Sequence, residues 1–334
     1  MKALVYTGPE SLEMRDATEP KPADGDLLIR VDSVGICGSD MHAYRGHDDR
    51  RPAPLILGHE AAGMVIAGAR QGERVTINPL VTCGVCEVCV DGRANLCADR
   101  QIISMPPRDG AFAEQVVIPE RNVVSVPDDV LDDKAALAEP IACGWHAVRL
   151  AERALHRPLA STRCLILGGG AIGLGAALIL ASRGVAEIWM ADTNAERRAV
   201  VATAGDFRVF DPITGPGPEA GSVDLVVDAV GLAITRAAAT RAVRPGGVVI
   251  HVGLGQATGG VDIRRMTLQE ITLIGTYTYT PTDFRETAEA IFAGRLGALD
   301  WMEVRRLEDG PQAFADILAG RVAAPKILLR PRGE

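Results

Sequence analysis

The first part of the chain alternates short apolar runs with glycine and proline, and this pattern predicts strands separated by turns. The turn residues recur at intervals typical of a mostly β domain. The runs lie at 27–31, 62–66, 74–77 and 113–118, and the start at 1–5 is strand-like as well. We therefore expect residues up to about 125 to build a mostly β domain.

From residue 132 onward the pattern changes to helices and then to an alternation of strands and helices. Alanine, leucine and valine recur at spacings of three and four over 132–153, which predicts a helix. Strand-like runs then alternate with helical stretches, and these runs lie at 164–167, 187–192, 223–228, 247–252 and 271–275. Such alternation predicts a parallel sheet covered by helices on both faces.

The remaining segments complete this outline. Helical stretches are expected at 284–293 and 312–318, and a last strand at 326–329. The Gly/Pro-rich segment 212–221 is expected to be a surface connection.

Length, composition and charge narrow the class of protein. The 334 residues suffice for two domains, and 47% hydrophobic with 23% charged residues describe a soluble globular protein. No apolar stretch approaches the roughly 20 residues that cross a bilayer, and the start lacks the apolar region and cleavage site of a signal peptide. A net charge of −8 argues against a non-specific nucleic-acid binder. We expect a cytoplasmic protein without membrane or nucleic-acid partners.

Four of the seven cysteines cluster in one short segment. They are Cys83, Cys86, Cys89 and Cys97, with a polar Asp-Gly-Arg turn inside the segment. The two gaps of two residues allow the backbone to wrap one ion with four sulfurs, which leaves no open position for a substrate. The alternatives are free thiols or two disulfides, although clustered thiols in a reducing cytosol more often hold metal. We interpret the segment at about 80–100 as a structural zinc lobe.

A glycine-rich turn follows the predicted strand at 164–167. It fits the pattern G-x-G-x-x-G, with Gly168, Gly170 and Gly173 at the glycine positions and Ala171 and Ile172 between them. The glycines permit a tight turn, close approach of the backbone to a pyrophosphate, and close packing of a helix on the strand. The helix N-terminus supplies unpaired N–H groups for the phosphates. The context of strand, turn and helix indicates a dinucleotide site.

The choice between NAD and NADP depends on the end of the next strand. Asp192 ends the strand at 187–192, where a carboxylate would bond the adenosine ribose hydroxyls and repel a 2′-phosphate. NAD is therefore favoured. Arg197 and Arg198 lie just beyond, and Arg197 is a candidate cofactor contact, because a guanidinium could take the phosphate if the loop turned inward. The alternative is a glycine turn with a capping aspartate and no cofactor.

A second set of metal-binding side chains lies in separate loops. Cys37 opens the segment Cys-Gly-Ser-Asp-Met-His, and His59 and Glu60 follow a glycine. Thiolate, imidazole and carboxylate with one open position describe a catalytic zinc, which acts as a Lewis acid. Glu139, in the helical stretch before the dinucleotide motif, is a further candidate ligand or a carboxylate that holds water. The choice between Glu60 and Glu139 stays open.

Together these motifs resemble the zinc-dependent medium-chain alcohol dehydrogenase superfamily, and within it the polyol (sorbitol and threonine) dehydrogenase branch. The matching segments span most of the chain and lie at 35–42, 58–63, 83–97, 137–140, 168–173 and 192. The resemblance implies an α/β fold, with a Rossmann-type doubly wound parallel sheet and a mostly β, GroES-like catalytic domain. It implies a catalytic domain at 1–145, an NAD-binding domain at 146–279, and a return to the catalytic domain at 280–334.

The resemblance also implies zinc ligands. Cys37, His59 and Glu60 would hold the catalytic ion, and the four clustered cysteines a structural one. Glu139 occupies the position where polyol members carry a glutamate and liver-type alcohol dehydrogenases a second cysteine. This replacement makes the ligands harder.

A proton path is implied by the same segment. Ser39 would accept the proton of the substrate hydroxyl, which then passes by the cofactor ribose to His42 and out to solvent. Asp40 would bond the far nitrogen of His59 and orient the ring. The alternatives are a turn residue for Ser39 and a solvated surface histidine for His42.

Two segments depart from the family pattern. The stretch at 65–75 is shorter than the usual loop. Sorbitol dehydrogenases carry an Arg-Tyr pair after the strand that ends here at 275, and the arginine helps to hold the polyol. Here Thr278 stands in the place of that arginine, and Tyr279 remains. Other side chains expected to line the cleft are Tyr44, Arg45, His47 and Phe112.

The favoured hypothesis is a zinc- and NAD-dependent dehydrogenase that interconverts a polyol or other vicinal secondary alcohol and its ketone. The nearest alternative is an L-threonine 3-dehydrogenase, for which Arg45 is the candidate carboxylate ligand. A remoter alternative is a catalytically silent NAD-binding protein, against which the open metal site argues. The apolar run at 271–278 predicts an edge strand, and hence a homodimer through paired cofactor domains or a homotetramer.

Overall fold

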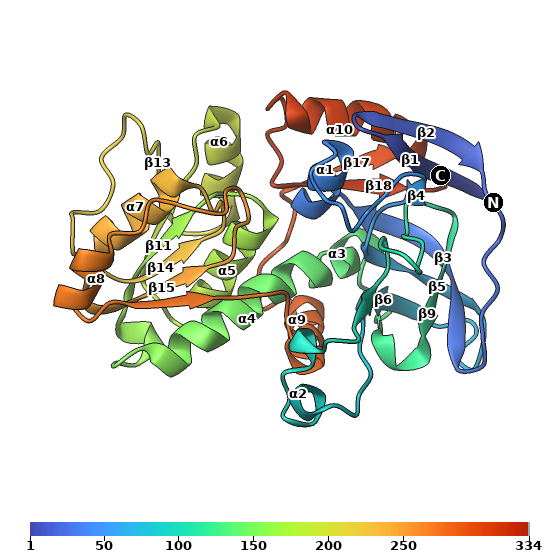
Figure 1. Cartoon of the computed structure of the whole chain (residues 1–334), viewed down its shortest axis with the longest axis horizontal. Helices are drawn as coiled ribbons and strands as arrows, with labels where there is room; N and C mark the ends of the chain where they lie inside the picture. The colour runs from blue at the N-terminus through green and yellow to red at the C-terminus, as the bar shows by residue number, and fades with distance from the viewer. Residues whose placement is uncertain (333–334) are drawn as a thin grey trace.

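The computed structural model describes residues 1–332, which form two bodies joined along helix α4 (Ala138–Ala154) (Figure 1). One body is built mainly on antiparallel strands, and the other is built on a parallel sheet. No helix among residues 1–332 combines the length and the apolar character that a membrane span requires.

The antiparallel body holds the chain's first strands together with its last ones. Its largest sheet contains β10 (Val123–Ser125), β6 (Arg74–Ile77), β5 (Glu60–Ala67), β3 (Asp26–Gly35), β18 (Lys326–Arg330) and β17 (Met302–Arg306) in that order, with β9 (Gln115–Pro119) also paired to β3. Along β3 the side chains of Leu27, Ile29 and Val31 are buried and alternate with partly exposed ones. Because successive side chains of a strand point to opposite faces, β3 turns one of its faces to the core.

Smaller elements complete this body. Two further small sheets contain β2 (Ser11–Asp16), β1 (Lys2–Gly8) and β4 (Leu55–Ile56), and β7 (Leu80–Val81) with β8 (Gln101–Ile102). Its helices are α1 (Gly38–Tyr44), α2 (Glu87–Val90), α3 (Asp132–Ala136) and α10 (Gly310–Leu318).

The parallel sheet has the strand order β13 (Arg208–Phe210), β12 (Glu187–Ala191), β11 (Arg163–Leu167), β14 (Val223–Asp228), β15 (Val243–His251) and β16 (Thr272–Gly275). Central strand β11 is buried on both faces. Its Cys164 and Ile166 pack in one apolar cluster with α5 (Ala171–Ser182), and its Leu165 and Leu167 pack in another with α7 (Ala233–Ala242). Burial on both sides explains why the sequence shows continuous apolar runs, and the predicted doubly wound fold is confirmed.

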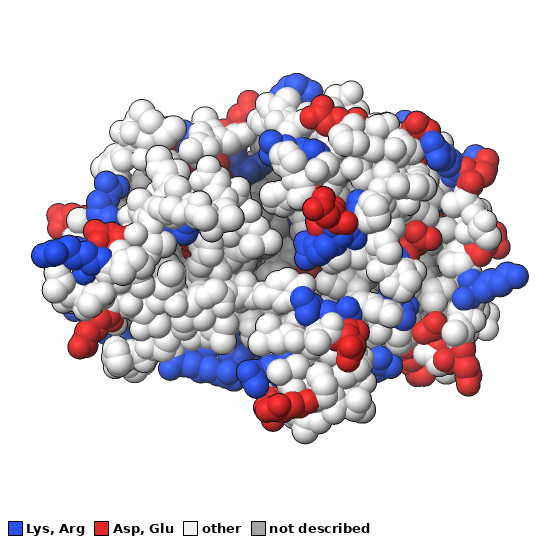
Figure 2. Space-filling view, in the orientation of Figure 1, with Lys and Arg blue, Asp and Glu red and all other residues white. Residues whose placement is uncertain are grey.

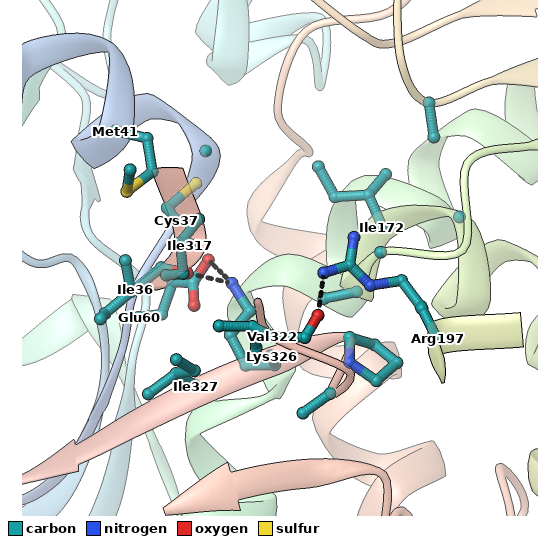
Figure 3. A pocket seen from close by; sticks show the side chains of 17 residues that line it. Ile36, Cys37, Met41, Glu60, Ile172, Arg197, Ile317, Val322, Lys326 and Ile327 are labelled. Atoms are coloured by element: carbon teal, nitrogen blue, oxygen red, sulfur yellow. Dashed lines mark hydrogen bonds and ion pairs between the residues drawn. The ribbon is translucent and has the colours of Figure 1, made fainter. Parts of the chain in front are cut away.

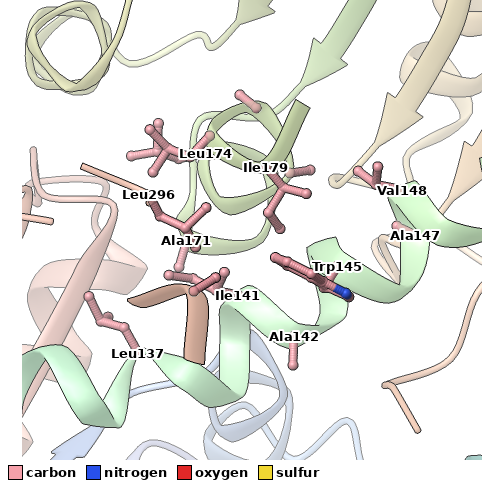
Figure 4. Close-up of a cluster of buried hydrophobic side chains, with 14 of the residues drawn as sticks. Leu137, Ile141, Ala142, Trp145, Ala147, Val148, Ala171, Leu174, Ile179 and Leu296 are labelled. Carbon is pink, nitrogen blue, oxygen red and sulfur yellow. The ribbon is translucent and has the colours of Figure 1, made fainter. Parts of the chain in front are cut away.

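Helix α4 carries the contact between the two bodies. Its Ile141 and Trp145 pack against α5 in the cluster of Figure 4, which also includes Ala62 of β5. The α4–α5 approach is close, because a Cβ added at Gly144 would lie 2.8 Å from the backbone nitrogen of Ala176. Helix α9 (Pro281–Phe292) packs on the same α4.

Most predicted elements are present, with shifted limits. Strands β6 and β14 have the predicted bounds, and segment 212–221 contains neither helix nor strand. The helix predicted over 132–153 is two helices, α3 and α4, which meet at Leu137. Strands β2, β10, β13 and β17 were not predicted, because they are short or carry polar residues on both faces.

Candidate functional site

The four clustered cysteines form a compact sulfur cage around α2. Their Sγ atoms all lie within 4.8 Å of one another, with close pairs at 3.4–3.9 Å. A disulfide would need about 2.05 Å, and a tetrahedral zinc with bonds of about 2.3 Å would hold its sulfurs about 3.8 Å apart. Backbone N–H groups of Val85 and Cys86 lower the pKa of Cys83 to about 6. In Cys86 the backbone N–H of Cys89 lowers the pKa, but the neighbouring thiols outweigh it and raise the pKa to about 12, so Cys83 ionises first. The cage fits a zinc ion.

A second cluster, named here the ligand cluster, consists of Cys37, His59 and Glu60. Each offers one ligand atom, and these atoms lie within 4.8 Å of one another. The pairing of β3 with β5 brings them together, because Gly35 lies opposite Glu60 in the register. Glycine at residue 35 leaves room for this carboxylate, since a Cβ there would lie 2.0 Å from Oε2 of Glu60 and would displace it. The sheet thus joins ligands that are more than twenty residues apart in sequence.

The ligand cluster contains an unsatisfied carboxylate oxygen. Oε1 of Glu60 accepts a hydrogen bond of 2.7 Å from Nζ of Lys326 (Figure 3). Oε2 of the same carboxylate is buried and finds no hydrogen-bond partner among residues 1–332. A buried anion with a free lone pair is costly unless a cation completes it. The cluster therefore fits a metal ion, and a mixed sulfur, nitrogen and oxygen donor set suits zinc.

Three side chains contact the ring nitrogens of His59. Its Nδ1 lies 3.2 Å from Oγ of Ser104 and 3.4 Å from Oδ1 of Asp40, and its Nε2 lies 3.4 Å from Oγ of Ser39. Burial opposes ionisation of Asp40, but the charge and hydrogen bond of His59 outweigh it and lower the pKa of that carboxyl. Asp40 thus lies where the sequence analysis placed it, on the far nitrogen of His59.

Glu139 lines the larger cavity with the ligand cluster, but it is not among the residues whose ligand atoms lie within 4.8 Å of one another. It occupies the first turn of α4, and its Oε1 accepts a hydrogen bond of 2.7 Å from the hydroxyl of Tyr279. Burial raises the pKa of Glu139 to about 7 and the pKa of Tyr279 well above its ordinary value, so the tyrosine is a proton donor. Of the two candidate third ligands, Glu60 is the one that the fold places beside Cys37 and His59.

The ligand cluster lies where two cavities meet. The larger cavity, of about 340 Å³, is bounded by both bodies and includes Ser39, His42 and Glu139 in its lining. The hollow between the two bodies is visible near the centre of Figure 2, with Lys and Arg side chains along its border. The smaller cavity, of about 220 Å³, lies next to the glycine-rich turn. The two cavities share Cys37, Gly38, Glu60, Ile172 and Ala229.

The smaller cavity is built on the start of α5. Gly170, Ala171, Ile172 and Gly173 line it, as does Arg197 from α6 (Ala195–Ala204) (Figure 3). The tight turn uses Gly168 at φ +100°, a conformation that favours glycine. At position 173 a Cβ would lie 1.9 Å from the carbonyl oxygen of residue 168, so only glycine fits there as well.

The carboxylate of Asp192 accepts hydrogen bonds from the backbone at this turn and after β12. Its Oδ2 accepts from the amide of Gly169 and its Oδ1 from the amide of Asn194, each at 2.8 Å. Arg197 donates to the carbonyl of Val322 at 2.9 Å, and its buried Nε has no partner in the described chain. Arg198 instead bonds the carbonyl of Asp192 and lies 3.5 Å from Asp211, outside the cavity lining.

Four of the expected cleft residues lie elsewhere, and those predictions were wrong. Tyr44 and Phe112 are buried against Phe314, with ring centroids 5.1 and 5.9 Å from it. Arg45 and His47 are absent from the lining of both cavities in residues 1–332. Helix α1 presents Ser39 and His42 to the larger cavity, whereas Tyr44 lies on the face turned to the core.

Several functional candidates escaped the sequence analysis. They are Lys326, Ser104, Arg50, Arg51, Thr276 and Cys143, of which the last four line the larger cavity. Cys143 is only partly buried. The sequence could have indicated the role of Lys326. This lysine begins the apolar run Ile-Leu-Leu of β18, and a strand rarely buries a charged side chain without a partner.

Comparisons with known proteins agree with this geometry. Residues 23–128 match the alcohol dehydrogenase GroES-like domain, and residues 171–293 match the zinc-binding dehydrogenase domain. The chain is 34% identical to L-galactonate-5-dehydrogenase of Escherichia coli (strain K12), over 89% of each chain. It is 30% identical to sorbitol dehydrogenase of Arabidopsis thaliana, over 84% of this chain and 81% of that one. A putative zinc-binding dehydrogenase from Sinorhizobium meliloti 1021, solved bound to NADP, superposes with a TM-score of 0.88 at 28% identity, over 99% of both chains.

Proposed function

The chain belongs to the zinc-dependent medium-chain alcohol dehydrogenase superfamily, in its polyol dehydrogenase branch, and on this basis we propose that it interconverts a polyol or other vicinal secondary alcohol and its ketone. NAD is the proposed hydride carrier. The observation that carries the proposal is the position of the ligand cluster, because Cys37 and Glu60 line both cavities. A carbinol carbon in the larger cavity and a nicotinamide entering from the smaller one would meet there.

Two zinc ions per chain are proposed. Cys37, His59 and Glu60 would hold the catalytic ion, and Cys83, Cys86, Cys89 and Cys97 the structural one. When bound, the catalytic ion polarises the substrate oxygen and eases loss of its proton. Two contacts within the protein would position these ligands. Lys326 donates to one oxygen of Glu60, and Asp40 lies beside Nδ1 of His59 and would orient its ring.

The proton of the substrate hydroxyl has a route along α1. Ser39 and His42 are three residues apart on this helix, so both side chains lie on one face and line the larger cavity. We propose that Oγ of Ser39 accepts the proton and that His42 delivers it to solvent. Burial and the nearby charge of Arg45 lower the pKa of His42, which keeps the imidazole neutral and able to accept a proton near pH 7.

The cofactor preference is argued from Asp192. Gly168, Gly170, Ala171, Ile172 and Gly173 would approach the pyrophosphate, and Arg197 would contact the cofactor from α6. The carboxylate of Asp192 lies under the turn and would repel a 2′-phosphate, which supports NAD over NADP. Arg198, the other candidate phosphate ligand, is engaged away from the cavity.

The domain division at 1–145, 146–279 and 280–334 is also proposed. It is supported by the membership of the sheets, since β17 and β18 join strands from the first 125 residues, and β11 to β16 form a separate sheet.

A homodimer or homotetramer in the cytoplasm is proposed as well. Strand β16 ends the order of the parallel sheet, and Leu273 in it is 39% exposed. A free strand edge with an exposed leucine is a surface that proteins commonly cover by pairing. Light scattering on the purified protein tests this assembly.

The proposed reaction is tested by following NAD reduction with pentitols, hexitols, sugar acids, simple alcohols and L-threonine, with NADP run alongside. We expect reduction with polyhydroxy substrates that stops with a chelator. Activity with L-threonine alone would move the chain to the threonine branch. Absence of turnover with every substrate, in protein that holds two zinc ions, would overturn the proposed reaction.

A further inference from the structure

The larger cavity has a basic wall that the proposed reaction does not use. Arg50 and Arg51 line this cavity, and neither belongs to the lining of the smaller one. The carboxylates in the same lining are Glu60 and Glu139, and each already has a hydrogen-bond donor within the protein. The basic wall therefore shares the lining with two carboxylates that are already engaged, and neither of them accepts a hydrogen bond from Arg50 or Arg51 in the described part of the chain.

The two arginines of the basic wall share one carboxylate. Asp48 accepts from Nε and Nη2 of Arg50 at 2.8 and 3.0 Å, and from Nη1 of Arg51 at 2.5 Å. Hydrogen bonds from the side chain and amide of Arg50 outweigh burial and lower the pKa of Asp48 to about 2, so Asp48 is ionised at pH 7. Arg51 also interacts with the charge of the buried Asp40, so both arginines have acidic partners.

The two arginines differ in freedom. Arg51 is buried, and its Nε also donates to the carbonyl of Ser104 at 3.1 Å, so its contacts hold the loop structure together. The side chain of Arg50 is 58% exposed, and its Nη1 makes no hydrogen bond to any of residues 1–332. A guanidinium held on one edge by Asp48 presents its other edge, already oriented, to a ligand.

Unpartnered hydroxyls lie in the same lining. Oγ1 of Thr276 and Oγ1 of Thr278 are buried and lack hydrogen-bond partners in the described part of the chain, and both residues line the larger cavity. Buried hydroxyls nearly always have partners in native proteins. Because these two oxygens have almost no accessible surface, they are not open contacts for a substrate, and the exposed Arg50 is a polar group that the lining offers to one.

We propose that Arg50 binds an anionic group at one end of a polyhydroxy substrate, and that this group is a carboxylate, so that the substrate is a sugar acid. This inference rests on the proposed function and narrows its substrate class. Arg50 is the one guanidinium in the described lining that is exposed, and a single such cation matches a carboxylate better than a phosphate monoester, which carries nearly two charges. The carboxylate takes no part in the reaction, in which the carbinol carbon gives a hydride to NAD and the hydroxyl gives a proton to Ser39.

The test compares six-carbon sugar acids with the hexitols and hexitol 1-phosphates of the same configuration, by initial rates of NAD reduction. We expect kcat/KM for the best acid to exceed that for its hexitol at least tenfold. In Arg50→Gln that value should fall about 10- to 100-fold through KM, as loss of a charge-assisted hydrogen bond predicts, with the hexitol unchanged. Arg50→Lys should lie between, because the charge remains and the fork is lost.

A matched control is available on the surface. Arg15 bonds Glu13 through Nε and Nη2, two residues away in sequence, as Arg50 bonds Asp48. Arg15→Gln removes the same charge far from the cavity, and we expect it to leave kcat/KM for the acid unchanged. Zinc content and melting temperature are measured on each variant.

The outcomes are separable. Equal kcat/KM for acid and hexitol, or an Arg50→Gln variant that loses both alike, would overturn the sugar-acid assignment and leave the dehydrogenase intact. A preference for the phosphate that disappears in Arg50→Gln keeps the anion site and overturns the carboxylate. No NAD reduction with any compound overturns the proposed function itself. If Arg50→Gln does not fold, the wild type decides, because KM for the acid should rise with ionic strength and KM for the hexitol should not.

Discussion

At the residue scale the chemistry depends on side chains whose charges the fold has adjusted. Oε1 of Glu60 is neutralised by Lys326 and Oε2 is left free, so the carboxylate is ready for a cation without being an isolated charge. The partner lysine lies 266 residues away in sequence. Lys326 also donates to the carbonyl of Ile36 at 2.8 Å, which ties it to the residue before Cys37. One ammonium group thus supports two positions of the ligand cluster.

His42 gives a prediction about pH. As a proton acceptor it acts in its neutral form, which prevails above its pKa, and that pKa lies below the ordinary 6.5. The midpoint of the acid limb of alcohol oxidation should therefore lie below pH 6.5. His42→Gln should lower kcat about 10- to 100-fold and remove this acid limb from the profile.

The pH–rate profile of kcat between pH 5 and 9 checks the role of His42. His156→Gln is the control, because that exposed histidine lies outside the cavity lining and is not among the groups that act on the pKa of His42. An acid limb that persists in His42→Gln would assign the limb to another group.

At the scale of elements, the contact between α4 and α5 sets the relative position of two parts of the site. Glu139 lies in the first turn of α4, and the glycine-rich turn leads into α5. Gly144→Ala would place a Cβ 2.8 Å from the backbone nitrogen of Ala176. The neighbour is backbone and cannot rotate away, so we expect a loss of about 1–3 kcal/mol in the free energy of unfolding. Urea unfolding measures it, and an unchanged midpoint would mean that the two helices separate without cost.

The contact between α4 and α9 gives a second prediction about pH. Asp283 of α9 is fully buried, accepts from Nδ1 of His146 at 2.9 Å, and lies 2.8 Å from Nε of Arg149. Burial alone would raise the pKa of Asp283, but hydrogen bonds from His146 and Thr280 lower it overall. A pKa depressed in the folded state gives stability that is present above the ordinary pKa of 3.8 and is lost as the pH falls through the folded value.

The variant Asp283→Asn should therefore cost about 3 kcal/mol at pH 7 and much less once the pH has fallen below the folded pKa of Asp283, because breaking a buried charge pair is expensive only while it is charged. Unfolding curves over this pH range test it. Asp16→Asn is the control, since Asp16 pairs with Lys2 on the surface, where such pairs contribute little. A constant difference at all pH values would show that the carboxylate charge plays no part.

At the scale of the whole molecule the two metal positions should separate function from stability. We expect the native protein to bind about two zinc ions, as its two sets of ligands require. Cys37→Ser should keep one ion, bind NADH and lose turnover. Cys89→Ser should lose the other ion and about 3 kcal/mol or more of stability, because no residue of α2, which carries Cys89, is buried in an apolar core.

Zinc analysis, NADH fluorescence and thermal unfolding of both variants check this separation. The control is Cys164→Ala, a thiol buried in the parallel sheet and outside both clusters. Near-normal turnover in Cys37→Ser would refute the assignment of the catalytic ligand cluster.

The sequence sufficed for features that depend on neighbouring residues. The alternation of strands and helices predicted the parallel sheet, and the glycine spacing predicted the turn at α5, since both are local patterns. Lys326 and Arg50 escaped because their roles depend on contacts between elements. Tyr44 and Phe112 were misplaced for the same reason, because position beside a ligand loop does not reveal which side of the sheet an aromatic ring occupies.

The pairing of β18 with β3 has a consequence for the order of events during synthesis. A ribosome releases the parallel sheet, with its glycine turn, before β18 emerges, and domains generally fold as they appear. Until residues 326–330 arrive, Glu60 lacks its ammonium partner and β3 lacks one neighbour. The parallel sheet of the nascent chain can thus mature first, while assembly of the reaction centre waits for residues 326–330.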